Sequence, residues 1–204
     1  MAAYRIGIIG AGNVGGTLGK IWSGRGHDVL FGVRNPETAE PVGRMGTLAE
    51  AFAHGEVLAL ATPWSAVREV LQSAGDLTGK ILFDCTNPLL PGLAGLEYGN
   101  DNSGAEMVAE WAPGARVVKV FNTTGFNVMA DPEFEGGPPA MFYCGDDAGA
   151  KAAARQLAGE AGFEALDAGP LAQARLLEPL ALLWITLAMK YGYGRDIAFR
   201  LLRR

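Results

Sequence analysis

Three glycines near the start of the chain have the spacing of a phosphate-binding turn. Gly10, Gly12 and Gly15 form the pattern G-x-G-x-x-G within "GIIGAGNVGG", between an apolar stretch and a helix-like stretch. The first glycine permits a tight turn, the second lets the backbone approach a pyrophosphate, and the third lets helix and strand pack closely. Free N–H groups at the start of the helix attract phosphate, so we expect a dinucleotide here. The residues predicted to hold its phosphates are Gly10, Ala11, Gly12, Asn13 and Val14.

The end of the second predicted strand indicates which dinucleotide binds. NAD-specific sites usually carry an Asp or Glu there, about 20 residues after the turn, to bind the ribose 2′-OH. In this chain the strand ends in "LFGVRNPE", with Val33 and Arg34 where the carboxylate is expected, and Glu37 only later. A guanidinium binds phosphate through two N–H groups and stacks on adenine. We therefore predict NADP, with Val33, Arg34 and Asn35 around its 2′-phosphate.

Polar segments follow three later predicted strands: "LATPW", "DCTNP" and "KVFNTTGFNVM". The carboxyl ends of parallel strands meet at one edge of a sheet, which is where ligands bind in such folds. We expect the cofactor to contact Ala61, Thr62 and Pro63 on its adenosine or ribose side, and Asn87, Asn122 and Thr123 at its nicotinamide end. Trp64 and Trp184 are either ring contacts or core residues.

Strand and helix patterns alternate along the chain. Strands are predicted at 4–9, 28–33, 56–61, 80–84, 116–121, 140–144 and 163–167; helices are predicted at 13–23, within 45–55, at 64–74, 103–111, 146–161 and 172–191, with a further turn or helix from 196. This order predicts an α/β, Rossmann-type doubly wound, mainly parallel sheet with a C-terminal helical extension. We expect one domain over 1–204, whose helices from about 172 pack on it or on a dimer partner.

Composition narrows the function classes. The chain is 49% hydrophobic and 19% charged with a net charge of −5, and no basic stripe appears, so a nucleic-acid partner is not expected. Cys85 and Cys144 do not form a CxxC pair, and no metal site is predicted. The start has no basic region before its apolar residues, and the apolar run at 180–189 is too short to span a bilayer. We expect a cytoplasmic protein without a membrane partner.

Five segments together resemble a known family. "GAGNVG", "GVRNPE", "ATPW", "KVFNTTG" and the late "DAGPLAQARLLE" are similar to NADPH-dependent reductases of the deazaflavin coenzyme F-420. The cytosolic domain of six-transmembrane metalloreductases looks similar, and pyrroline-5-carboxylate reductases share the N-terminal half. The resemblance implies hydride transfer between NADP(H) and a deazaflavin or flavin. It implies phosphate contacts at 10–14, the 2′-phosphate at Val33 and Arg34, and Thr62 and Pro63 along the cofactor.

The sequence departs from that family at the second strand, where Ser-Arg is common and a further basic residue often follows. Here Val33 precedes Arg34, and the next Lys or Arg is Arg44. The loop at 88–102 also differs. The resemblance therefore leaves the hydride acceptor open among a deazaflavin, a flavin and a similar ring.

Hydride transfer between two flat rings mainly requires stacking and exclusion of water, so we nominate no catalytic acid–base pair. The late helix carries leucines at helical spacing that pack on its own domain or build a homodimer, and we favour the dimer. Two other functions remain open. One is an imine or carbonyl reductase related to pyrroline-5-carboxylate reductase. The other is a non-catalytic NADP-binding sensor or partner subunit.

Overall fold

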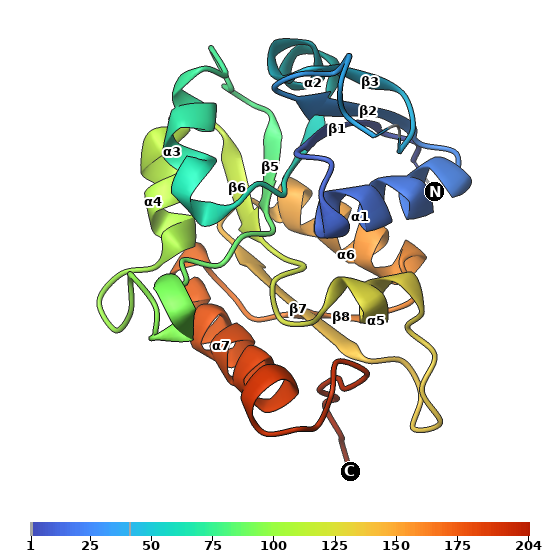
Figure 1. Cartoon of the computed structure of the whole chain (residues 1–204), viewed down its shortest axis with the longest axis vertical. Coiled ribbons are helices and arrows are strands. Elements are labelled where there is room, and N and C mark those ends of the chain that lie inside the picture. Colours follow the sequence, from blue (N-terminus) through green and yellow to red (C-terminus); the bar gives the residue numbers. More distant parts are fainter. Residues whose placement is uncertain (1, 41) are drawn as a thin grey trace.

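A computed structural model describes residues 2–40 and 42–204 and contains one sheet between two helical layers (Figure 1). Its strand order is β3-β2-β1-β4-β5-β6-β7-β8, and all neighbours are parallel except β6 and β7. The strands are β1 (Arg5–Ile9), β2 (Asp28–Val33), β3 (Met45–Thr47), β4 (Val57–Leu60), β5 (Ile81–Asp84), β6 (Arg116–Lys119), β7 (Ala140–Gly145) and β8 (Glu164–Asp167). The predicted Rossmann-type fold is confirmed.

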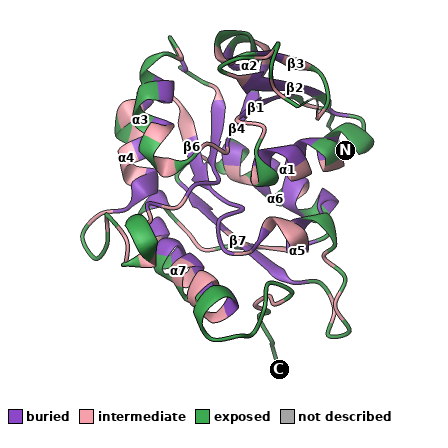
Figure 2. Ribbon diagram, in the orientation of Figure 1, coloured by how far each residue is buried: buried purple, intermediate pink, exposed green. Residues whose placement is uncertain are grey.

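Helices cover both faces of the sheet. They are α1 (Asn13–Gly24), α2 (Leu48–His54), α3 (Trp64–Gln72), α4 (Gly104–Trp111), α5 (Phe126–Ala130), α6 (Ala148–Glu160) and α7 (Ala174–Lys190), with short 3-10 turns at Pro91–Leu93 and Leu171–Gln173. One core cluster lies under α1, α5 and α6, and the other under α2, α3, α4 and α7. Strand side chains alternate between these clusters, and Figure 2 shows the central strands largely buried, whereas the edge strands β3 and β8 are only partly buried.

Local signals in the sequence account for several helix starts. Thr47 caps α2 by accepting from the Glu50 amide, and Glu50 accepts from the Thr47 amide in return. Ser103 caps α4 by accepting from the Glu106 amide. Such caps satisfy N–H groups that have no partner within the helix.

Two elements were absent from the prediction, and one prediction is wrong. The three residues of β3 and the five of α5 are too short to show periodicity. The segment from Asp196 forms no helix. It lies instead against α7 and β7, where the Trp184 indole donates to the Ile197 carbonyl (2.7 Å) and the Phe199 carbonyl accepts from the Ala140 amide (2.9 Å). These tertiary contacts replace the hydrogen bonds that a helix would supply.

The C-terminal helix α7 buries one face and exposes the other. Leu177, Glu178 and Trp184 are buried, whereas Leu176 and Leu183 are 65% and 49% exposed. The predicted leucine stripe is therefore divided between core and surface. Residues 171–190 are also the one helical stretch in the described part of the chain that is long and apolar enough to cross a membrane, although core helices of soluble proteins meet the same criterion.

Candidate cofactor site

The carboxyl ends of five neighbouring strands are level with one another. Ile9 pairs with Gly32 and with Leu60, Leu60 pairs with Asp84, and Asp84 pairs with Lys119. The segments predicted to bind cofactor begin directly after these residues. The fold thus brings the glycine turn, Arg34, the 61–63 segment, Asn87 and the 122–124 segment to one edge of the sheet.

The glycine turn has the shape that a pyrophosphate requires. Gly10 has φ of +106°, a conformation that side chains disfavour, and its amide donates to the Gly32 carbonyl (3.0 Å). A Cβ at Gly15 would collide with the Gly10 carbonyl, whereas a Cβ at Gly12 would meet nothing within 4 Å. Gly15 is therefore needed for packing, and Gly12 leaves open space beside the first turn of α1.

Arg34 lies directly after β2 and is exposed. No ion pair joins it to a carboxylate among residues 2–40 and 42–204. Arg44, the next cation along the chain, instead pairs with Asp28 at the start of β2 (3.0 Å). The Arg44 guanidinium is therefore held at the start of β2, opposite the end where Arg34 lies. This leaves Arg34 as the cation available to a 2′-phosphate. Val33 is partly buried beside Arg34, and Asn35 is exposed.

Four of the five buried polar side-chain atoms that have no hydrogen-bond partner within residues 2–40 and 42–204 lie just after β4 and β6. They are the hydroxyls of Thr62, Thr123 and Thr124 and the side-chain oxygen of Asn122, and the fifth is the side-chain oxygen of Asn127 on α5. Both amide hydrogens of Asn122 are in use, because Nδ2 donates to Asn87 Oδ1 (3.1 Å) and to the Leu177 carbonyl (3.2 Å). Its Oδ1 is consequently a fixed acceptor. Since buried polar groups are normally paired, these atoms fit a ligand rich in hydrogen-bonding groups, as NADP is.

Phe121 directs the chain into this polar segment. Its φ is +61°, a left-handed conformation that is strained for a bulky residue. The ring is 1% exposed and packs edge-on against Trp22, with Phe83 also adjacent. Core packing therefore holds the turn that presents Asn122 and Thr123.

A cavity of about 800 Å³ opens at the same edge. Five of the predicted residues line it, namely Val14, Ala61, Thr62, Pro63 and Asn87. Cys85 and Thr86 complete this inner wall. Burial raises the pKa of the Cys85 thiol, so Cys85 is an apolar wall residue and not a nucleophile.

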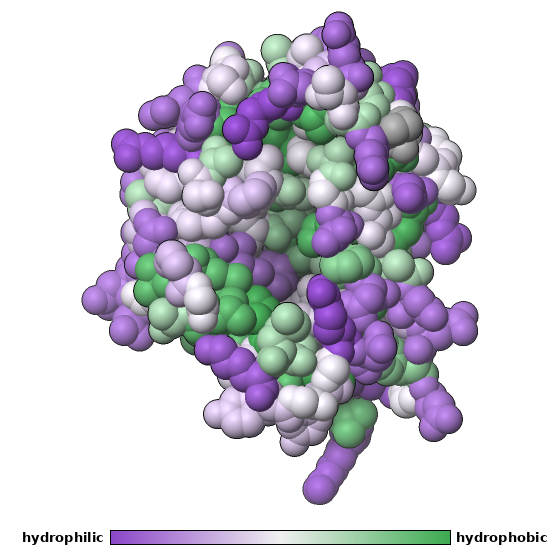
Figure 3. Space-filling view, in the orientation of Figure 1, coloured by the Kyte–Doolittle hydropathy of each residue, from purple (hydrophilic) through white to green (hydrophobic). Residues whose placement is uncertain are grey.

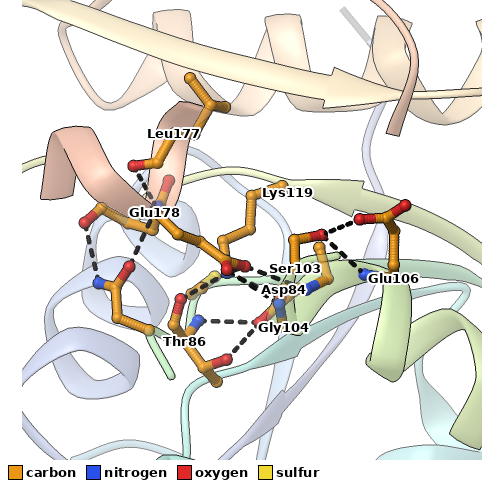
Figure 4. Close-up of polar contacts among 12 residues, drawn as sticks. Asp84, Thr86, Ser103, Gly104, Glu106, Lys119, Leu177 and Glu178 are labelled. Atoms are coloured by element: carbon orange, nitrogen blue, oxygen red, sulfur yellow. Dashed lines mark hydrogen bonds and ion pairs between the residues drawn. The ribbon is translucent and has the colours of Figure 1, made fainter. Parts of the chain in front are cut away.

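A buried ionic cluster lies just behind the cavity wall (Figure 4). Lys119 at the end of β6 is 0% exposed, and its ammonium contacts Asp84 Oδ2 and Glu178 Oε1, both at 2.9 Å, and the Thr86 carbonyl at 2.7 Å. Burial acts to lower the pKa of Lys119, but the two carboxylates outweigh it and hold the pKa above its ordinary value. Lys119 is thus held by three partners inside the fold, and it does not belong to the lining of the cavity.

The cluster connects four elements around the nicotinamide end. Glu178 on α7 also accepts from the Gly104 and Ala105 amides at the start of α4 (2.8 and 3.0 Å). Asp84 Oδ1 accepts from the amide and hydroxyl of Thr86. The carboxylates therefore fix the segment after β5 and the position of α7, which supplies the Leu177 carbonyl to Asn122.

Sequence reasoning did not assign a role to this cluster or to part of the cavity wall. Asp84 and Lys119 stood inside quoted motifs, and each is a charged residue ending an apolar strand, which is a usable signal of a buried pair. Trp64 does line the cavity, together with Tyr98 and Trp111. Trp184 does not, because it is buried against Gly125 and its indole is used by the C-terminal segment.

Comparison with known proteins identifies the family. Residues 5–88 match the model of the family described as NADP oxidoreductase, coenzyme F420-dependent. The crystal structure of a putative F420-dependent NADP reductase from Arthrobacter sp. FB24 superimposes with a TM-score of 0.90 at 31% identity, covering 98% of this chain and 100% of that one. The chain belongs to this family. It is therefore a member of a family of oxidoreductases whose cofactor is NADP.

Two curated relatives extend the similarity. The metalloreductase STEAP3 of Rattus norvegicus is 34% identical over 187 residues, which cover 88% of this chain but only 37% of STEAP3. The F420-dependent NADP reductase of Methanocaldococcus jannaschii is 29% identical over 151 residues, covering 70% of this chain and 66% of that protein. The chain thus spans about a third of the metalloreductase and about two thirds of the archaeal reductase.

Alanine substitutions at Gly12 and Gly15 should have opposite effects: the first should weaken cofactor binding, and the second should lower stability. In Gly12→Ala the new methyl enters open space, so the melting temperature should stay near that of the wild type while NADPH affinity falls about tenfold or more, since the methyl occupies the pyrophosphate position. In Gly15→Ala the methyl overpacks the turn and should cost about 1–3 kcal/mol of stability. Calorimetric titration and thermal unfolding of both variants measure this; equal losses of stability would contradict the assignment.

Removing the cation of the buried cluster should be strongly destabilising. Lys119→Met leaves two carboxylates buried without their partner, at a cost of about 3–5 kcal/mol in denaturant unfolding at pH 7. Because the folded pKa of Lys119 is raised, its contribution is fully present below its unfolded value of 10.5 and is lost only as pH rises through the higher folded value. The difference between wild type and variant should therefore be constant from pH 7 to 9 and shrink above pH 10.5. The matched control is Lys151→Met, whose partner Asp167 is 43% exposed, and it should change stability little.

Proposed function

We propose that the protein is an NADPH-dependent oxidoreductase that transfers hydride between NADP(H) and a deazaflavin, a flavin or a similar ring acceptor. The observation that carries the proposal is the replacement of the usual carboxylate after β2 by the exposed Arg34, which is level with the glycine turn and forms no ion pair within the described part of the chain. The full-length similarity to a putative F420-dependent NADP reductase supports the acceptor class.

Different residues at the carboxyl edge of the sheet would bind different parts of the cofactor. Backbone amides of residues 11–14 would hold the pyrophosphate, and Arg34 would bind the 2′-phosphate with Asn35 beside it. Asn122 Oδ1 is fixed as an acceptor, and the neighbouring Thr123 and Thr124 hydroxyls have no hydrogen-bond partner among the residues that the structure describes. These three groups suit the carboxamide of a nicotinamide, which donates and accepts.

The chemistry needs positioning more than acid–base catalysis. When bound, NADPH supplies a hydride from nicotinamide C4, carrying two electrons and one proton to the acceptor ring, which takes its second proton from water. The protein's contribution is to hold both rings in contact and to exclude water from the inner wall at Cys85 and Thr86. Both residues are buried, which suits that task.

We also propose a cytoplasmic homodimer. The motivation is the exposed apolar face of α7, where Leu176, Leu183 and Met189 are 65%, 49% and 59% exposed. Such a face is costly to leave in water and suits a second copy of the chain.

Cofactor preference is tested by Arg34→Ala. Wild-type protein should bind NADPH more tightly than NADH, and the variant should lose about tenfold to hundredfold in NADPH affinity with NADH binding unchanged, because a charge-assisted contact to the 2′-phosphate is removed. Isothermal titration calorimetry measures both. Arg25→Ala, at the far end of α1, is the matched control. Equal binding of the two cofactors by the wild type would contradict the role of Arg34, and failure of NADPH to reduce any flavin or deazaflavin would contradict the reaction.

A further inference from the structure

Residues 195–200, called the strap from here on, connect three elements of the fold. They form no helix or strand, and Figure 1 shows the chain turning back from the end of α7 toward α5 and β7. Residues 197–199 are partly buried, and Ala198 packs against the core cluster under α5. Figure 3 shows a hollow at the centre of the same face, with the C-terminal residues projecting from its lower edge. The strap does not belong to the lining of the cavity, so it can act on the cofactor edge only through the elements it contacts.

The strap fixes the first turn of α5. Both amide hydrogens of Asn127 are donated to it, one to the Arg195 carbonyl (2.8 Å) and one to Asp196 Oδ1 (2.7 Å). The Arg195 guanidinium also lies 4.8 Å from the centroid of the Phe126 ring, which is a cation–π contact. Helix α5 has five residues and no side-chain cap. Because so short a helix is marginal by itself, its position depends on tertiary contacts of this kind.

The strap also fixes the side chain of Trp184 on α7. The indole donates to the Ile197 carbonyl (2.7 Å), and the residue is 5% exposed. A Cβ at Gly125 would lie 2.6 Å from Cη2 of the indole ring, closer than such atoms approach one another. The φ of Gly125 is −80°, which any residue adopts, so glycine is needed there for close approach and not for its conformational freedom. The indole ring thus lies directly on the backbone that follows Thr124.

The polar segment 122–125 is held by α7 at both of its ends. At one end Asn122 Nδ2 donates to the Leu177 carbonyl (3.2 Å), and at the other end Trp184 covers Gly125. The two anchoring residues are two turns apart on α7, about 10 Å along the helix axis. The two threonine hydroxyls without a hydrogen-bond partner among the described residues lie between these anchors in the chain. A displacement of Trp184 or of α5 therefore moves both hydroxyls.

We infer that Trp184 and Asn127 are positioning residues for the nicotinamide half of the cofactor and that the strap sets where they lie. The inference rests on the proposed function, which places the carboxamide at the 122–124 segment, and it adds the residues that hold this segment from behind. The glycine turn and Arg34 follow β1 and β2, which β4 and β5 separate from β6 and β7. Loss of the strap contacts should therefore weaken binding of the nicotinamide half and leave the 2′-phosphate half unchanged.

NADP⁺ and adenosine 2′,5′-bisphosphate test the inference, because the bisphosphate has the adenosine and the 2′-phosphate but no nicotinamide. Trp184→Phe keeps an aromatic ring and removes the indole donor, whereas Asn127→Ala removes both side-chain bonds to the strap. Each variant should lose about threefold to tenfold in NADP⁺ affinity in isothermal titration calorimetry, with affinity for the bisphosphate unchanged.

A second readout and a control follow the same contacts. Deuterium exchange of the amides of residues 123–127 should be faster in both variants than in the wild type. Gln156→Ala is the matched control, because its side-chain amide likewise donates to a terminal segment, at the Ala2 carbonyl (2.8 Å). It should change neither the affinity for either ligand nor the exchange of residues 123–127.

The outcomes separate this inference from the proposed reaction. A loss confined to NADP⁺ in both variants would support the positioning role, even where the wild type reduces no flavin or deazaflavin, a result that would refute the reaction alone. Unchanged NADP⁺ affinity in both variants of an enzyme that does turn over would overturn the inference and leave the reaction intact. Equal losses for the two ligands would also overturn it, because they would show a general disturbance of the fold.

Discussion

The ammonium of Lys119 is fully buried, and the position of the site depends on the groups that pair with it. Its partners come from three places in the chain: Asp84 at the end of β5, the Thr86 carbonyl just beyond, and Glu178 on α7. Two carboxylates and one ammonium leave one negative charge in the interior. That charge faces the first amides of α4, where the helix dipole is positive. A buried cation must be paired, so these elements cannot move apart independently.

The buried cluster also positions residues at the cofactor edge of the sheet through a few direct contacts. Asp84 fixes Thr86 on the cavity wall, and α7, held by Glu178, supplies the carbonyl of Leu177 to Asn122. Asn122 is then left with one free acceptor, and the strained turn at Phe121 holds its backbone. The part of the edge around Asn122 is in this way built from contacts between elements, whereas the glycine turn at Gly10 and Gly12 is built from one local pattern.

That difference explains what the sequence could predict. The glycine turn and the longer strands and helices are local patterns, and the structure bears them out. The absence of helix after Asp196 depends on contacts with Trp184 and Ala140 that no local pattern contains. The ion pairs of Lys119 with Asp84 and Glu178 join residues far apart in the chain, and the aromatic cavity wall of Trp64, Tyr98 and Trp111 likewise assembles from three segments. The sequence signal of the cluster is a charged residue at the end of an apolar strand, as at Asp84 and Lys119.

The most direct test of this account is a crystal structure of the protein with NADP⁺. The account predicts the pyrophosphate on the amides of residues 11–14, the 2′-phosphate on Arg34, and the carboxamide hydrogen-bonded to Asn122 Oδ1 or to the adjacent threonine hydroxyls. A dinucleotide bound away from the carboxyl edge, or bound there with Asn122 Oδ1 still unpaired and Arg34 in solvent, would contradict it.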